Sequence, residues 1–341
     1  MNLPQRLIEN SSVRSNMAIA LGKYTSVDGF IPRRKYRVVT HAHSDHTVDL
    51  NKSIGTQGAI IATPETIDML KVLYGKRIPL SKLRALRIGE RFRVGEDETL
   101  TFVRAEHIPG SVQVLLENDK GFRALYTGDF KNPGSGTPIV EDLDVLIIDA
   151  TYGHPKYVRP SQNEVLESLI ELIEYALSLG RPVKIYAYHG KIQEVMQLLR
   201  EYNVKEPFVA PNKIYKLSKA LERHGYSFGD LVLKESDTYS ELVKGGQFIE
   251  FDHYNKWHKC SNENWIHIRL DGWLVNSVRL KVSDNRWIVA FSDHADFNGT
   301  MYYVEESRPK LVIVDASRSN FATSFASKLR LRGFHAIPMP L

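Results

Sequence analysis

The spacing of apolar residues predicts a strand-rich first third of the chain. Leu100–Arg104 alternates between apolar and polar side chains, as a half-buried strand does. Val112–Leu116 and Phe122–Tyr126 flank a glycine-containing turn, which is typical of a β-hairpin. Three further segments have a clear pattern, namely buried strands at Tyr36–Thr40 and Val145–Ile148 and a helix at Pro64–Tyr74.

The pattern changes after Tyr157, where helices and strands alternate. Ser161 and Glu164 form a capping-box pattern before a helix with an apolar stripe, and Gly180 ends that helix. This order is typical of a parallel α/β sheet. The later elements are a strand at Val183–Ala187, a helix at Ile192–Tyr202, strands at Trp287–Phe291 and Leu311–Val314, and a helix at Asn320–Arg332. No Pro/Gly-rich linker divides the chain, which favours one domain inserted into another.

Composition places the chain among globular proteins. Of its 341 residues, 43% are hydrophobic and 25% are charged, and no apolar run is long enough to span a bilayer. The N-terminus lacks the apolar segment of a secretory signal, and the single Cys260 excludes an internal disulfide framework. We therefore expect a cytoplasmic protein without a membrane partner. The net charge of +5 is compatible with a polyanionic partner.

The segment His41-Ala42-His43-Ser44-Asp45-His46 directly follows the first predicted strand. Packing of a protein core does not explain why three imidazoles and a carboxylate lie together at the end of one strand. The arrangement can hold two metal ions, with His41 and His43 on one and Asp45 and His46 on the other. Zinc accepts such nitrogen and oxygen ligands and, with a coordination position left open, activates water. The alternative is a His-rich surface loop.

Four more polar residues follow predicted strands: His107, Asp129, Asp149 and His294. A single Asp or His at such a place is usually a cap or turn residue. Here, however, four of them occur in the same chain as the His41–His46 segment, which favours a common site. One metal site takes His41, His43 and His107, and Asp129 can bridge to the second. Two metal ions held in this way suit in-line hydrolysis at phosphorus.

The metal-ligand motifs resemble those of a known superfamily. Four features match, in order, motifs one to four of the metallo-β-lactamase fold: Asp28, the His41–His46 segment, His107 and Asp129. The resemblance covers nearly the whole chain. It implies an α/β fold, a four-layer αββα sandwich with an inserted α/β domain, in which Asp28 orients the ligands of the two metals.

Further motifs narrow the resemblance to the β-CASP nucleases. Asp149–Thr151 is similar to their motif A, and Phe291–Asp296 is similar to motif B. His189–Glu194 resembles a segment of the inserted β-CASP domain, and Ile61–Thr66 is most similar to the ligase-associated DNA exonucleases. The resemblance implies a metallo-β-lactamase domain over residues 1–158 and 286–341 and a β-CASP domain over residues 159–285.

The resemblance also implies roles for individual residues. Asp45, Asp149 and His294 are expected to be catalytic, with Asp149 bonded to His294 and His294 protonating the leaving oxygen or contacting the scissile phosphate. Ser111 and Lys191 are expected to contact substrate phosphate, Lys191 at a strand–helix turn. The cofactors are two divalent ions, zinc by expectation, with manganese or magnesium acceptable at the second position.

Asp315 lies at the position of a third β-CASP motif, motif C, and differs from the residues that are usual there. RNA-processing members usually carry His there as a ligand of the second metal, and eukaryotic DNA-repair members usually carry Val. An Asp ligand would make the second site harder and more tolerant of manganese or magnesium. Alternatively, Asp315 caps the turn into the next helix. Motif C therefore does not decide between DNA and RNA.

The sequence thus predicts a nuclease that hydrolyses phosphodiester bonds of single-stranded nucleic acid, foremost a DNA exonuclease of repair. The alternatives are an RNA-processing exo- or endonuclease, a small-molecule hydrolase, and a non-catalytic nuclease-like subunit. Repair or RNA-processing proteins are the expected protein partners, and the oligomeric state is open. Weaker candidates are a third zinc site at His253, His258 and Cys260, base-stacking rings at Tyr254, Trp257 and Trp265, and a basic cluster at Arg33, Arg34, Lys35 and Arg37.

Overall fold

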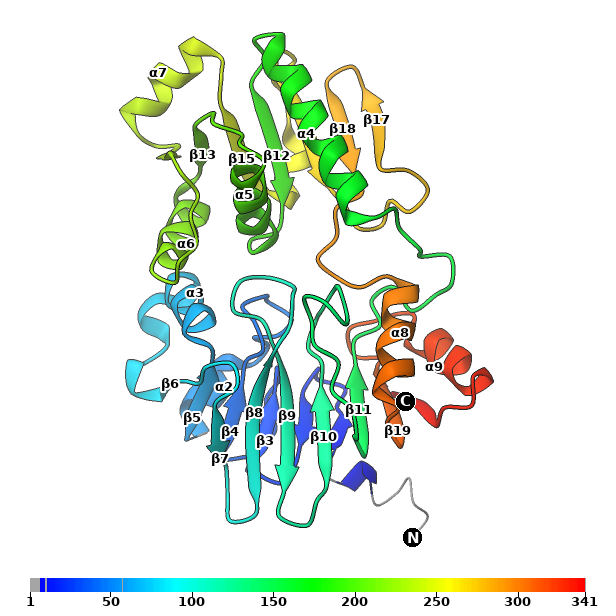
Figure 1. Ribbon diagram of the computed structural model, residues 1–341. Coiled ribbons are helices and arrows are strands. Elements are labelled where there is room, and N and C mark those ends of the chain that lie inside the picture. Colours follow the sequence, from blue (N-terminus) through cyan, green and yellow to red (C-terminus); the bar gives the residue numbers. More distant parts are fainter. Residues whose placement is uncertain (1–6, 10, 57, 341) are drawn as a thin grey trace. The chain divides into compact units, whose positions relative to one another are not determined.

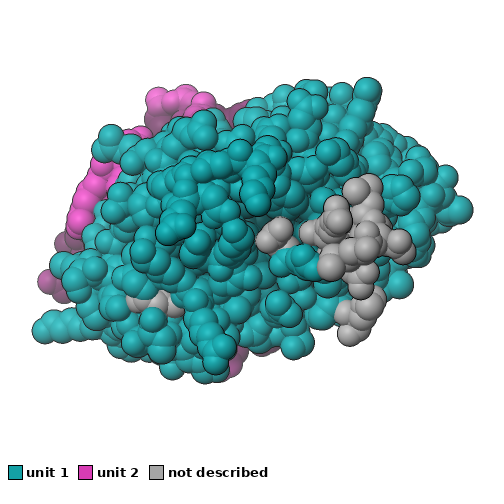
Figure 2. Space-filling model, turned by 90° about the horizontal axis from the view of Figure 1, so that it is seen from below, with its two compact units in different colours: residues 1–157, 294–341 teal, residues 158–293 magenta. Residues whose placement is uncertain are grey.

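The computed structural model describes residues 7–9, 11–56 and 58–340, which form two compact units (Figure 1). Unit 1 comprises Met1–Tyr157 and His294–Leu341, and unit 2 comprises Val158–Asp293 (Figure 2). The chain enters unit 2 once and returns from it once, so unit 2 is a continuous insertion in unit 1. Each unit is built on its own sheets.

Unit 1 contains two mixed sheets. The six-stranded sheet has the order β1-β2-β3-β4-β5-β6. Its strands are β1 Ser11–Val13, β2 Ile19–Leu21, β3 Thr25–Val27, β4 Tyr36–Val38, β5 Ala59–Ala62 and β6 Leu83–Ala85. The seven-stranded sheet has the order β20-β19-β11-β10-β9-β8-β7. Its strands are β7 Arg91–Arg93, β8 Glu98–Arg104, β9 Val112–Asn118, β10 Arg123–Tyr126, β11 Val145–Ile148, β19 Leu311–Asp315 and β20 Ala336–Met339.

The two sheets of unit 1 share a core formed by alternate strand residues. Val145 and Ile147 of β11 lie in this core, whereas Leu146 and Ile148 lie in a second core on the other face of the sheet. Successive side chains of a strand point to opposite faces, so β11 is buried on both sides. This explains why its sequence is a continuous apolar run rather than an alternating one.

Helices cover the outer faces of both sheets in unit 1. The second core is completed by α8 (Phe297–Ser307) and α9 (Ala322–Leu331), which pack on the seven-stranded sheet (Figure 1). On the six-stranded sheet, α2 (Leu50–Thr56) contacts β5 and α3 (Pro64–Tyr74) contacts β6. The layer order is therefore αββα, and the predicted fold class is confirmed.

Unit 2 is an α/β layer built on a nearly parallel sheet of order β14-β13-β15-β12-β16-β18-β17, in which only the β17–β18 pair is antiparallel. Its strands are β12 Val183–Ala187, β13 Phe208–Ala210, β14 Leu231–Leu233, β15 Ile249–His253, β16 Ile266–Leu270, β17 Arg279–Ser283 and β18 Arg286–Val289. Its helices are α4 Gln162–Ser178, α5 Lys191–Glu201, α6 Asn212–Glu222 and α7 Asp237–Gly245. Short 3-10 turns occur at Tyr254–Lys259 in this unit and at Gly75–Arg77 and Leu80–Lys82 in unit 1.

The expected domain boundary at residue 286 cuts the sheet of unit 2. Strand β18 pairs with β16 and β17 of that sheet, so the unit continues to Asp293. The sequence-based prediction contains neither β16 nor β17, although β17 and β18 form a local hairpin, and it therefore places the boundary too early.

Most predicted elements are present with small shifts at their ends. The predicted bounds of α3, β11 and β12 are the observed ones, and Ser161 caps α4 in a complete capping box with Glu164. The predicted strand Trp287–Phe291 is shorter and lies at Arg286–Val289. The sequence missed β1, β2 and β3, which have three residues each, because so short a segment has no readable periodicity. Within the part of the chain that is described, no helix is long and apolar enough to cross a membrane.

Candidate metal centre

Polar residues follow the carboxyl ends of several strands of unit 1. Asp28 follows β3, the His41–His46 segment follows β4, Asp129 follows β10 and Asp149 follows β11. Strands β3 and β4 run parallel, as do β10 and β11, so the carboxyl ends of each pair meet at one edge of a sheet. His107 joins them from the loop between β8 and β9.

A first group of ligand-type side chains consists of His41, His43, His107 and Asp129, whose ligand atoms all lie within 4.8 Å of one another. The Nε2 atoms of His41 and His107 lie 3.1 and 3.2 Å from Nδ1 of His43. Both Nε2 atoms lie 3.6 Å from Oδ2 of Asp129. Three ring nitrogens and one carboxylate oxygen therefore converge on a common point.

A second group consists of Asp45, His46 and Asp129. Nε2 of His46 lies 3.2 Å from Oδ2 of Asp129 and 3.4 Å from Oδ2 of Asp45. This nitrogen is buried and has no hydrogen-bond partner of acceptable geometry among the described residues. Because the same oxygen of Asp129 faces both groups, Asp129 is placed to bridge two ions.

The second group is oriented by Asp28, which is fully buried. Its Oδ2 lies 2.7 Å from Nδ1 of His46 and accepts a hydrogen bond of 2.6 Å from the hydroxyl of Thr40. Its Oδ1 accepts a hydrogen bond of 2.8 Å from the backbone N–H of Thr40. Because Asp28 occupies Nδ1 of His46, Nε2 is the nitrogen that remains for a metal ion. This agrees with the expectation that Asp28 orients a ligand.

His107 is held by a tight turn that continues through Gly110 and Ser111. Gly110 has a φ of +83°, and a Cβ there would lie 2.7 Å from the hydroxyl of Thr63. Thr63 and Thr66 of the α3 N-terminus donate hydrogen bonds to the carbonyl of Gly110. The buried hydroxyl of Ser111 accepts a hydrogen bond from the N–H of Ile108, so Ser111 closes the turn, and its contact with a phosphate stays a prediction.

His294 lies beside the two groups and is held by Asp149. Its Nδ1 lies 3.0 Å from Oδ2 of Asp149, and its Nε2 lies 3.8 Å from Oδ2 of Asp129. Asp149 is itself fixed, since its Oδ1 accepts hydrogen bonds from the N–H and the hydroxyl of Thr151. The pair joins two segments that are far apart in sequence, and it directs Nε2 of His294 towards the ligand groups.

The donor set fits divalent metal ions such as zinc. Imidazole nitrogens and carboxylate oxygens are ordinary zinc ligands. The nitrogen–nitrogen separations of 3.1 and 3.2 Å are close to the edge of about 3.3 Å in a tetrahedron built on Zn–N bonds of about 2.0–2.1 Å. The buried, unbonded Nε2 of His46 is the kind of atom that ligation would satisfy.

The electrostatics of the two groups also favour a bound cation. Burial, with His46 and His107 nearby, holds the pKa of His41 well below its usual value, so this imidazole is neutral with a free lone pair. Burial disfavours the charged form of Asp129, but His46 and His294 outweigh it and hold the pKa of Asp129 well below its usual range. Burial likewise opposes charge on His46, yet Asp129 and Asp45 raise its pKa well above the usual value, so a metal ion bound at Nε2 would replace a proton there. Ionised carboxylates thus face imidazole nitrogens, and Asp129, His41 and His46 are buried.

Comparison with known proteins agrees with this geometry, since residues 30–206 match the β-lactamase superfamily domain. The chain belongs to the metallo-β-lactamase superfamily. Its relatives place it in the β-CASP branch. A solved structure from Enterococcus faecalis, of a protein of unknown function, shares the fold with a TM-score of 0.56 at 14% identity, over 82% of this chain and 74% of that one.

Three relatives differ in their names and in how much of each chain is matched. An uncharacterized protein of Acidianus ambivalens, named for its place in the lig 3′ region, is 43% identical over 38% of this chain and 91% of its own length. A protein of Opitutus terrae named "Probable DNA ligase" is 28% identical over 91% of this chain and 29% of its own length. The 5′ exonuclease Apollo of Rattus norvegicus is 25% identical over 81% of this chain and 49% of its own length. Other relatives are named as RNases. The chain thus spans less than half of the ligase and of Apollo.

At the motif C position of this β-CASP chain, Asp315 is engaged away from the ligand groups. It is buried, and its Oδ1 accepts hydrogen bonds from the N–H and the hydroxyl of Ser317. Its Oδ2 lies 2.9 Å from Nη1 of Arg318. Among the described residues, neither ligand group includes Asp315. Of the two interpretations, the geometry favours the turn cap over the metal ligand, because both oxygens already have strong donors.

Two predicted phosphate contacts are also used otherwise. Lys191 is buried in unit 2, where its Nζ lies 3.0 Å from Oδ1 of Asp293. Arg37 of the basic cluster is fully buried in unit 1 and donates hydrogen bonds to the carbonyls of His46 and Val48. It neither faces water nor is free for a phosphate, since a buried guanidinium must satisfy its N–H groups within the protein.

The weaker candidates in unit 2 are placed differently. The groups of described residues able to hold a metal ion include none of His253, His258 and Cys260. Trp257 is buried, whereas the ring of Tyr254 stacks on that of Tyr188 with centroids 4.9 Å apart. The structure therefore does not support a third zinc site.

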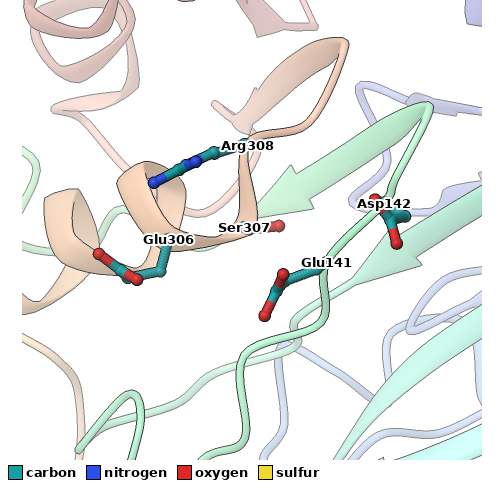
Figure 3. A pocket seen from close by; sticks show the side chains of 5 residues that line it. All are labelled: Glu141, Asp142, Glu306, Ser307 and Arg308. Carbon is teal, nitrogen blue, oxygen red and sulfur yellow. The ribbon is translucent and has the colours of Figure 1, made fainter.

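The pocket drawn in Figure 3 lies elsewhere in unit 1 and has a volume of about 280 Å³. Its lining combines the loop before β11 with the end of α8: Glu141, Asp142, Glu306, Ser307 and Arg308. None of these residues belongs to either ligand group, and three of the five are acidic. The candidate metal centre is thus identified by the chemistry of its side chains.

Sequence reasoning missed Thr40 and Arg318. Thr40 links Asp28 to the rings, because its hydroxyl lies 3.1 Å from Nδ1 of His41. Arg318 donates to the backbone of Asp45. The only local signal was a charged pair three residues apart, Asp315 and Arg318, directly after a buried strand.

Proposed function

We propose that this chain is a metal-dependent nuclease that hydrolyses phosphodiester bonds of single-stranded nucleic acid, and specifically an exonuclease acting on DNA. The observation that carries the proposal is the placement of Oδ2 of Asp129. This oxygen faces the first ligand group, the second ligand group and Nε2 of His294 at distances of 3.2 to 3.8 Å. Superfamily membership and the names of the relatives support the reaction class.

The residues that would hold the metals follow from the two groups. His41, His43 and His107 would hold the first ion, Asp45 and His46 the second, and Asp129 both. When bound, two divalent ions would activate water and stabilise the negative charge that develops on the phosphate oxygens. Zinc suits the three imidazoles of the first group, and the oxygen-rich second group would also accept manganese.

His294 is proposed as the general acid. Asp149 accepts from Nδ1 of His294, which sets the tautomer and keeps Nε2 available on the side of the ligand groups. A proton on Nε2 can be transferred to the leaving oxygen, and the neighbouring Asp149 carboxylate stabilises the imidazolium form. Asp28 acts only through His46 and Thr40, as a positioning residue.

We also propose that unit 2 is the β-CASP domain and that DNA is the preferred polymer. The name of one relative, a probable DNA ligase, supports DNA, and that of another, a 5′ exonuclease, supports the exonuclease. The basic net charge of +5 is consistent with a nucleic-acid substrate.

The proposal is tested with purified protein, zinc or manganese, and a panel of labelled single strands. The panel pairs DNA with RNA, each carrying a 5′-phosphate or a 5′-hydroxyl, and includes one DNA duplex. We expect stepwise shortening of single-stranded DNA from one end, faster than that of RNA. His43→Ala protein, prepared in parallel, reports any contaminating nuclease.

Three outcomes would change the proposal. Preferred cleavage of RNA would reassign the polymer, and internal cuts would replace exonuclease by endonuclease. Metal-loaded protein that is inert on every member of the panel would overturn the nuclease itself.

A further inference from the structure

Arg318, between β19 and α9, connects four separate parts of unit 1. Its side chain is 6% exposed, and its Nη1 lies 2.9 Å from Oδ2 of Asp315. Its Nη2 donates hydrogen bonds to three backbone carbonyls, those of Met17 at 2.8 Å, Asp28 at 3.2 Å and Asp45 at 3.0 Å. One guanidinium thus holds three loops and a carboxylate in a fixed arrangement.

Two of these carbonyls belong to residues with a left-handed backbone. Met17 has a φ of 65° and Asp28 a φ of 52°. Residues other than glycine rarely adopt this conformation, and it persists where the surroundings hold it in place. Arg318 donates a hydrogen bond to each of these two carbonyls and so stabilises the left-handed backbone at Met17 and Asp28.

The contacts of Arg318 converge on the second ligand group. Asp45 is held directly through its carbonyl. His46 is held indirectly, because Arg318 bonds the carbonyl of Asp28 and the carboxylate of Asp28 lies 2.7 Å from Nδ1 of His46. Arg318 also donates a hydrogen bond of 3.3 Å to the hydroxyl of Ser317, and none of its five hydrogen-bonded partners is His41, His43 or His107.

The guanidinium is suited to this position in a way that lysine is not. Its planar fork directs several N–H donors at fixed angles, so it can serve a carboxylate and several carbonyls at once. It also brings a permanent positive charge close to the carboxylates of Asp28 and Asp315, which are buried. Asp315 in turn fixes the guanidinium, which gives the motif C carboxylate a role other than ligation.

We propose that the Asp315–Arg318 pair positions Asp45 and His46 and thereby sets the affinity of the second metal position, without contributing a ligand. The inference rests on the proposed function only in assigning two divalent ions to the ligand groups. It predicts that metal fills the His41, His43, His107 and Asp129 group independently of Arg318. Filling of the Asp45, His46 and Asp129 group depends on it.

The test is calorimetric titration of the metal-stripped full chain with Zn²⁺, combined with metal content after dialysis. Wild-type protein should bind two ions. Arg318→Met should weaken the second binding step about 10- to 100-fold, as loss of a group that orients a ligand does, and should change the first step by less than about twofold. Asp315→Asn should weaken the second step in the same direction, and Arg318→Lys should recover part of the loss.

Arg200→Met is the matched control. Arg200 also donates to three backbone carbonyls, those of Phe228, Val204 and Glu206, but it does so within unit 2. Both zinc affinities should be unchanged in this variant. Circular dichroism establishes that each variant is folded, and if Arg318→Met is not, Arg318→Lys and Asp315→Asn decide.

Two results would overturn the inference. A folded Arg318 or Asp315 variant with an unchanged or tighter second step would show that the pair does not position the ligands. Equal loss of both steps would show that the effect is not selective. Failure of the nuclease proposal is separate, since a protein that cuts no nucleic acid can still show the selective loss of the second ion.

Discussion

Two buried carboxylates, one in each unit, are neutralised in opposite ways. Glu250 of unit 2 is fully buried, with Nζ of Lys184 at 2.7 Å, Nζ of Lys234 at 2.6 Å and the hydroxyl of Tyr239 at 3.0 Å. Asp129 of unit 1 is 5% exposed and is surrounded by histidine nitrogens. No lysine or arginine is paired with it among the described ion pairs.

The difference separates a closed charge cluster from one whose side chains could hold a metal ion. Burial opposes charge on Lys184, but Glu250 and Asp252 outweigh burial and raise its pKa, so the lysine is a permanent cation and the cluster is closed. An imidazole that has lost its proton offers a lone pair to a metal ion, whereas the ammonium group of a lysine has none to offer. A buried carboxylate closed by lysines therefore stabilises a fold, whereas one ringed by imidazoles is ready for a metal ion.

The largest expected effect comes from Asp129→Asn. This change removes the shared oxyanion ligand and should lower kcat/KM on single-stranded DNA by at least about a thousandfold, because several kcal/mol of charge stabilisation is lost. Initial rates and zinc content measure it. Asp142→Asn, in the pocket of Figure 3, is the control and should be near wild type. Full activity of Asp129→Asn would contradict the assignment of the bridging ligand.

Glu250→Gln should leave catalysis intact and destabilise unit 2. Lys234 would lose its buried counter-charge and Lys184 would keep only Asp252, so the free energy of unfolding should fall by about 3 kcal/mol, at the low end for a broken buried pair because Lys234 is partly exposed. Urea unfolding followed by tryptophan fluorescence reports on this unit alone, since it contains all four tryptophans: Trp257, Trp265, Trp273 and Trp287. If the variant changed the zinc affinity and not the stability, the Glu250 cluster would not be the purely stabilising cluster proposed here.

His294→Gln should reduce kcat by about 100-fold, the lower end for loss of a general acid, with little change in zinc content. The amide keeps a polar group at the site but cannot exchange the proton. Asp149→Asn should have a smaller effect in the same direction, because it acts through His294. If zinc content fell together with the rate, His294 would belong to the ligands and not to proton transfer.

The smallest effect is expected for Ser161→Ala at the start of α4. Ser161 and Glu164 form a complete capping box, and loss of the cap should lower the free energy of unfolding of unit 2 by about 1 kcal/mol. The tryptophan signal should shift to lower urea concentration while zinc affinity and cleavage rates stay unchanged. Ser178→Ala near the end of the same helix, where the hydroxyl only bonds the carbonyl of Tyr175, provides the comparison.

Local signals explain which parts of the fold were predictable. The helix α3 begins at Pro64 after the capping Thr63, and β11 is a continuous apolar run, so both were predicted with their observed bounds. Strand β18 was assigned to the wrong unit because its partner strands β16 and β17 were not recognised in the sequence. The side chains of the candidate metal centre stood out in the sequence because histidines and aspartates that cluster at strand ends have few structural uses, and their role as ligands stays a prediction.

The sequence alone determined the residue types of the metal centre and the strands that carry them, because these are local properties of short segments. Tertiary structure decided how each charge is used. Asp315 and Arg37 could have served a metal or a phosphate as far as the sequence shows, yet both are committed to buried hydrogen bonds. The sequence does not reveal the role of Arg318, because that role depends on hydrogen bonds to the carbonyls of Met17, Asp28 and Asp45. Hydrogen bonds between segments hundreds of residues apart depend on packing and leave no pattern along the chain.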